Sequence, residues 1–181
     1  MIKESYTERY YTYHSKYISN VLALRPPQEQ SLDYFAKLCD IISLQKNPTT
    51  MQQIIEENEE EYNALPTLEK KAKFLHDKAS TIASEFYADD LKNAQDYFKT
   101  LGSFERDFPS VCFALATGIG KTRLMGACIA YLRYEKGIKN FFVMAPNLTI
   151  YRKLKADLGN PSNPKYVFKG LDLFVDPPRI V

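Results

Sequence analysis

Apolar residues recur every three or four positions through most of the first 104 residues, which is the spacing of helices that bury one face. Pro26 and Pro27 mark a boundary, and a helix is predicted to begin there. Asn47 and Pro48 are expected to end it. The apolar positions that define this helix are Leu32, Phe35, Leu38, Cys39 and Ile42.

Further helices are predicted downstream of this boundary. Thr50 and Gln53 have the spacing of a capping box, so a helix should begin beside them. A long apolar stripe starts at Thr67 and continues to Phe86. Another begins near Asp89 or Asp90 and ends before Gly102, because glycine commonly follows the end of a helix. Residues 1–104 are therefore predicted to be a helical N-terminal region.

After residue 104 the pattern alternates between short apolar runs and helical spacing. The predicted strands are "SVCFALA" (110–116), "NFFVMAP" (140–146) and "KYVFKG" (165–170), and the predicted helices are 122–137 and 147–159. Strand, helix, strand, helix, strand implies a parallel sheet with right-handed crossovers. The expected fold class is α/β, with residues 105–181 as the first part of a sheet flanked by helices.

Charge separates the same two regions. Residues 1–104 carry 12 Lys/Arg against 16 Asp/Glu, whereas residues 105–181 carry 12 against 6. An anionic partner is therefore expected to meet the C-terminal part.

Several classes of protein are disfavoured. The three cysteines form no CxxC pair and the two histidines have no second ligand at metal spacing, so neither a disulfide framework nor a zinc site is predicted. The amino terminus lacks the apolar stretch of a secretion signal, and no run approaches the roughly 20 apolar residues of a membrane span. A cytoplasmic location without membrane contact is expected.

The segment "ATGIGKT" (116–122) carries most of the chemical signal. Gly118 and Gly120 allow a backbone to wrap its amides around an anion, and the following helix directs its positive dipole end to the same place. Lys121 can then reach the β and γ phosphates of a nucleotide, and the Thr122 hydroxyl can bind Mg²⁺. The alternative is an ordinary glycine turn before a helix, and Leu115 stands where the general phosphate-loop pattern has glycine.

This loop resembles motif I of superfamily-two helicases and translocases, in which T-G-x-G-K-T is usual. The resemblance implies a RecA-like P-loop lobe that binds ATP and Mg²⁺, with Lys121 and Thr122 as catalytic residues. The loop residues implied to contact the nucleotide are Thr117, Gly118, Ile119, Gly120, Lys121, Thr122 and Arg123. "LRPPQ" is similar to the motif upstream of the loop, which implies that Gln28 reads adenine and that Arg25 helps to form its pocket.

"FFVMAPNLTIYRKL" (141–154) is similar to motif Ia of the same enzymes, whose amides and hydroxyls contact nucleic-acid phosphates. The implied contacts are Pro146, Asn147, Leu148 and Thr149. Arg152, Lys153 and Lys155 add positive charge nearby, although a solvated basic helix face would look the same.

Over residues 24–46 and 104–181 the chain looks most like the Res subunit of type III restriction endonucleases. This resemblance implies a hydrolase that couples ATP hydrolysis to DNA translocation and cleavage, with a modification (methyltransferase) subunit as partner. One alternative is a superfamily-two helicase without a nuclease, acting on DNA or RNA. Another is an interaction module that binds nucleotide without turnover.

The D-E-x-H motif of these enzymes, which holds Mg²⁺ and orients water, has no counterpart in the 181 residues. The expectation is therefore of an N-terminal fragment of a larger motor, cut before that motif and inactive by itself. A cut sheet leaves an open edge, through which the fragment is expected to self-associate.

Overall fold

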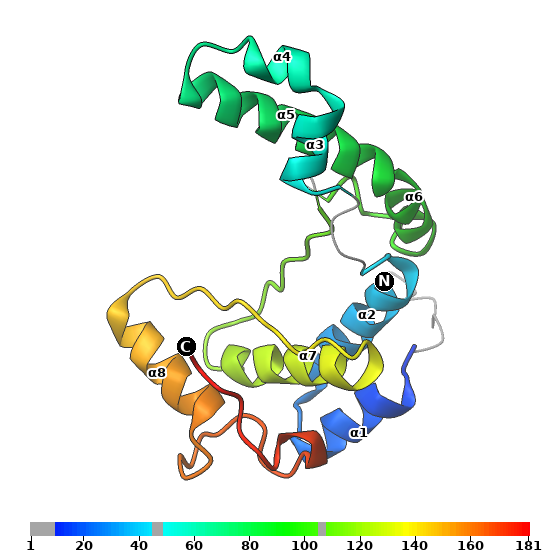
Figure 1. Cartoon of the computed structure of the whole chain (residues 1–181). Coiled ribbons are helices and arrows are strands. Elements are labelled where there is room, and N and C mark those ends of the chain that lie inside the picture. Colours follow the sequence, from blue (N-terminus) through cyan, green and yellow to red (C-terminus); the bar gives the residue numbers. More distant parts are fainter. Residues whose placement is uncertain (1–9, 45–48, 105–107) are drawn as a thin grey trace. The chain divides into compact units, whose positions relative to one another are not determined.

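The computed structural model describes residues 10–44, 49–104 and 108–181, and every regular element in these ranges is a helix (Figure 1). The chain divides into two compact units, residues 1–37 with 113–181 and residues 38–112. The elements are α1 (Tyr13–Val21), α2 (Pro26–Ile41), α3 (Met51–Glu57), α4 (Glu59–Asn63), α5 (Leu68–Phe86), α6 (Ala88–Tyr97), α7 (Lys121–Glu135), α8 (Leu148–Gly159) and the 3₁₀ turn η1 (Asp172–Phe174).

Local capping explains where several helices begin. The Thr50 hydroxyl accepts from the Gln53 amide at 3.2 Å, and the Thr50 amide donates to Gln53 Oε1 at 2.8 Å. This confirms the predicted capping box before α3. The Thr67 hydroxyl likewise accepts from the Lys70 amide at 3.3 Å, so α5 begins directly after it.

The helix ends agree less closely with the sequence pattern. α5 ends at Phe86, as the apolar stripe predicts, but α6 stops at Tyr97, because Phe98 has the non-helical ψ of 84°. α2 ends at Ile41, and the predicted terminators Asn47 and Pro48 lie outside the described residues.

The described residues of the second unit form an apolar core that also buries the Asp90 carboxylate. α3 and α6 each pack against α5. The core residues are Leu38, Tyr87, Ala94 and Phe104, surrounded by the partly buried Ile41, Ile42, Ala83, Leu91, Phe98 and Leu101. The Asp90 carboxylate, 7% exposed, accepts from the Ser43 amide at 2.6 Å and from the Ser43 hydroxyl at 3.2 Å. These bonds satisfy a charge that burial alone would disfavour.

In the first unit α7 is the central helix, and α1 packs against it (Figure 1). Small residues allow close approach, and a methyl group at Gly126 would lie 2.8 Å from Cβ of Val167. Tyr131 is fully buried, and its ring meets Phe35 of α2 edge-on at 6.1 Å between centroids. The part of α2 around Phe35 and the 166–171 turn therefore both pack against α7.

The predicted α/β fold is wrong for this structure. In the described ranges no residue forms a strand, so there is no parallel sheet and no RecA-like arrangement of strands. Residues 110–116 and 140–146 run as irregular chain, and Phe142 and Met144 are 89% and 80% exposed. The expected self-association through a sheet edge loses its basis, since the described chain has no sheet.

Hydrogen bonding explains the discrepancy. A helix pairs its backbone groups internally, whereas a strand needs a neighbouring strand to receive them. No described backbone–backbone hydrogen bond involves residues 110–116 or 140–146. The apolar side chains of the run 165–170, namely Tyr166, Val167 and Phe168, are buried in a turn. In this turn the Val167 amide donates to the Asp157 carbonyl at 2.9 Å. The apolar composition of run 165–170 therefore reflects burial in a turn. Runs 110–116 and 140–146 are irregular chain.

Among the helices of the described residues, none combines the length and the apolar character needed to cross a bilayer.

Candidate functional site

The segment 117–122 forms a tight bend that leads directly into α7. Gly118 and Gly120 have φ values of +81° and +95°, in the left-handed region that glycine occupies without strain. Gly120 is the N-cap of α7, and Lys121 is its first helical residue. The bend therefore has the predicted glycine conformations and the predicted helix, although irregular chain rather than a strand precedes it.

The start of α7 leaves donors available. Gly120 provides no side-chain cap, and its carbonyl already accepts from the amides of Arg123 and Leu124 at 3.0 and 3.1 Å. The amides of Lys121 and Thr122, in the first turn, have no intrahelical acceptor. The Lys121 side chain is exposed and Thr122 is half-buried. Unpaired amides, a helix dipole and a long cationic side chain thus meet at one exposed point.

Two residues of the predicted adenine motif lie against this bend. Gln28 Nε2 donates to the Gly120 carbonyl at 2.9 Å, and Arg25 Nη1 donates to the Gly118 carbonyl at 3.4 Å. Gln28 Oε1 accepts from the Arg25 amide at 2.9 Å, and the Gln28 residue is only 1% exposed. The structure therefore brings Arg25, Gln28 and the glycine bend together across more than 90 positions of sequence.

Arg123, also predicted to contact nucleotide, makes a different contact. Its Nη1 donates to the Leu22 carbonyl at 3.2 Å, at the connection between α1 and α2. The next residue, Ala23, has a positive φ of 46°, which is unusual for a residue with a Cβ. In this structure Arg123 fastens the start of α7 to that connection.

The predicted nucleic-acid residues lie at the start of α8. The Asn147 side chain caps the helix, accepting from the Ile150 amide at 3.0 Å, and Pro146, Leu148 and Thr149 are exposed. No hydrogen bond or ion pair between described residues links them to the glycine bend. α8 continues from them with three exposed cations, Arg152, Lys153 and Lys155.

The sequence did not indicate a polar cluster at the other end of α7. The Tyr134 hydroxyl donates to the Asp172 carboxylate, and the Leu173 amide donates to the Tyr134 oxygen at 3.2 Å. Burial, followed by the bond to Asp172, raises the pKa of Tyr134, and the same bond lowers the pKa of Asp172. Tyr134 and Asp172 are 38 positions apart, so neither spacing nor composition signals their pairing.

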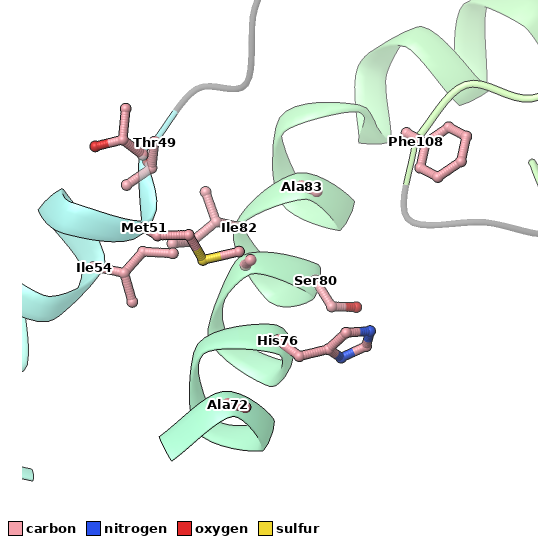
Figure 2. Close-up of a pocket in the computed structure, with 11 residues that line it drawn as sticks. Thr49, Met51, Ile54, Ala72, His76, Ser80, Ile82, Ala83 and Phe108 are labelled. Atoms are coloured by element: carbon pink, nitrogen blue, oxygen red, sulfur yellow. The ribbon is translucent and has the colours of Figure 1, made fainter. Parts of the chain in front are cut away.

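The second unit contains a cavity of about 350 Å³. It is lined by Thr49, Thr50, Met51, Ile54, Ala72, His76, Ala79, Ser80, Ile82, Ala83 and Phe108. Figure 2 shows the His76 ring and the Ser80 side chain on the same side of α5. His76 Nδ1 lies 3.5 Å from Asp77 Oδ1, and the His76 side chain is 75% exposed. This lining contains no Lys or Arg, so the cavity does not offer the chemistry of a phosphate site.

Comparison with protein families matches residues 22–172 to the family described as type III restriction enzyme, res subunit. The match includes Arg25, Gln28, the glycine bend and the start of α8. No curated protein and no solved structure matches the chain significantly.

Proposed function

The chain belongs to the type III restriction enzyme res subunit family, which points to a helicase-like, ATP-binding domain, and from this we propose that the glycine bend holds the triphosphate of ATP. In this proposal the bend from Thr117 to Gly120 and the first amides of α7 surround the phosphates. Lys121 neutralises the β and γ phosphates, and Thr122 offers its hydroxyl to Mg²⁺. Lys121 and Thr122 are the residues proposed to act in hydrolysis.

The observation that carries this proposal is the open bend, which leads directly into the N-terminus of α7. A methyl group placed at Gly118 would meet no atom within 4 Å, so the approach to the backbone is unobstructed. Lys121 is exposed rather than turned into the core. The residues present therefore fit an anion with its counter-cation, since backbone amides, a helix dipole and a lysine are the groups that bind phosphate.

We further propose that DNA is the track, and that ATP hydrolysis is coupled to movement along DNA and to cleavage, with a modification (methyltransferase) subunit as partner. The supporting observation is the charge on α8. Its only acidic residue, Asp157, is 4% exposed and accepts from Asn163 Nδ2 at 2.9 Å. The exposed charges of this helix are therefore all positive, as contact with phosphates requires.

Titration of the 181-residue chain with a fluorescent ATP analogue and Mg²⁺ tests the nucleotide site. We expect saturable binding in the wild type and a loss of at least about tenfold in Lys121→Ala, because a charge-assisted bond to phosphate is removed. Lys139→Ala is the matched control, since it removes an exposed lysine beyond the far end of α7. Absent binding in the wild type, or equal affinity in Lys121→Ala, would overturn the proposal.

A further inference from the structure

The segment "RPPQ" begins α2 in a way that determines where its glutamine can point. Arg25 precedes the first helical residue, and Pro26 and Pro27 occupy the first turn, where the absent N–H groups cost nothing. Gln28 is then the third helical residue, whose side chain can reach back to the amide before the helix. Its Oε1 does so, accepting from the Arg25 amide at 2.9 Å.

This local bond leaves the amide nitrogen of Gln28 directed at the glycine bend. Nε2 donates to the Gly120 carbonyl at 2.9 Å, and a methyl group at Gly120 would lie 2.8 Å from the same nitrogen. Both ends of the carboxamide are engaged, and the residue is 1% exposed. Pairing with both N6 and N7 of adenine would require this amide to leave its present partners and its buried position.

Arg25, just before α2, holds the Gly118 carbonyl, and Gln28 holds the Gly120 carbonyl, which also accepts from the amides of Arg123 and Leu124 within α7. No described peptide bond is cis. In a trans peptide the N–H of the next residue points opposite to the carbonyl. Holding these two carbonyls on the α2 side therefore turns the amides of Ile119 and Lys121 to the other side, toward the anion of the proposed function.

We propose that Gln28 and Arg25 are positioning residues for the phosphates, acting through the backbone of the bend and not through the base. This inference rests on the proposed triphosphate site. It predicts that replacing either residue weakens every ligand with a triphosphate by the same factor, whether or not that ligand has a base.

Calorimetric titrations with ATP, GTP and inorganic tripolyphosphate test this inference. Gln28→Glu keeps the shape and Oε1 but replaces the donor with an oxygen facing the Gly120 carbonyl. We expect about fivefold weaker binding of all three ligands, the loss typical of one neutral hydrogen bond. Gln30→Glu makes the same chemical change at an exposed position of α2 and should leave all three affinities unchanged.

The pH dependence provides a readout that a general loss of structure would not give. A carboxyl is protonated as the pH falls toward its pKa, and burial raises that pKa. In the Gln28→Glu variant, protonation of the introduced carboxyl restores a donor to the Gly120 carbonyl. The wild type is expected to bind more tightly than Gln28→Glu at about pH 8. The ratio of the two affinities should fall toward one as the pH is lowered to about 5.5.

Arg25→Met gives a second route that leaves the buried amide intact, because Arg25 is exposed and its side chain donates to the Gly118 carbonyl. It too should weaken the three ligands by one common factor. A loss confined to ATP, with tripolyphosphate and GTP unaffected, would overturn the inference in favour of adenine reading. Absence of tripolyphosphate and ATP binding in the wild type would instead contradict the proposed site itself.

Discussion

The two glycines of the bend provide a direct energetic test of the contact with Gln28. Gly118 and Gly120 both have positive φ, so alanine at either position places a Cβ in the left-handed region, at roughly 1–2 kcal/mol. Alanine also restricts the unfolded chain, which offsets about 0.4–1 kcal/mol of that cost. At Gly118 nothing lies within 4 Å of the added methyl, so the expected net destabilisation is about 1 kcal/mol.

Gly120→Ala carries a second penalty. Its methyl group would stand 2.8 Å from Gln28 Nε2 and would force the amide away from the carbonyl it now meets at 2.9 Å. A buried donor that loses its acceptor costs about 1–3 kcal/mol. Gly120→Ala should therefore destabilise the chain by about 1–3 kcal/mol more than Gly118→Ala. In a Gln28→Ala background the obstructing amide is gone, and this difference should fall close to zero.

Urea denaturation followed by circular dichroism at the helix band measures these differences as a double-mutant cycle. Gly137→Ala is the control for backbone strain alone, because Gly137 has a φ of +66° and open space around it. Equal penalties at Gly118 and Gly120, or a gap that persists without the Gln28 side chain, would refute the reasoning.

Two further predictions concern surfaces away from the bend. Lys153→Ala and Lys155→Ala should each weaken DNA binding and lower the salt slope by about one unit for each phosphate that is no longer neutralised. Fluorescence anisotropy at several salt concentrations checks this, and an unchanged slope would argue against α8 as the DNA face. The pKa of Tyr134 lies above its ordinary value of 10.0, so its contribution to stability is complete below pH 10 and is lost as the pH rises through the raised folded value. Tyr134→Phe should therefore show a shallower loss of unfolding free energy above about pH 10 in an alkaline denaturation series, and an equally steep loss would contradict the bond to Asp172.

The helices were predictable where their determinants are local. Thr50, Gln53 and Thr67 act within three residues of their own positions, so the sequence contains the whole interaction. Gly137 follows α7 for the same kind of reason, since only a residue tolerant of positive φ fits there. The glycine conformations of the bend also followed from short-range chemistry.

The absence of strands in the described residues was not predictable, because strand pairing is a property of two segments. Phe142 and Val167 belong to runs of similar composition, yet Phe142 is 89% exposed and Val167 is 6% exposed. The difference lies in their surroundings: Val167 packs against Gly126 of α7, whereas the Phe142 side chain faces solvent. The same limit applies to Gln28. Its motif was recognisable, but its engagement with Gly120 depends on a contact between residues 92 positions apart.

The bend is held in place by contacts at both ends of α7. Residues 14–28 contact α7 at both of its ends. His14 Nδ1 lies 3.1 Å from Glu135 Oε1 near the last turn, while Arg123 meets Leu22 and Gln28 meets Gly120 at the first.

α1 packs against α7 between these two ends, and its residue Ile18 is fully buried. A helix fastened at both ends cannot rotate about its axis without breaking one of these contacts. The direction of the Lys121 amide is therefore supported by α1 and the start of α2 in addition to the glycines and the first hydrogen bonds of α7. On this reasoning, residues more than 90 positions upstream of the bend add to the proposed phosphate affinity that Lys121 provides directly.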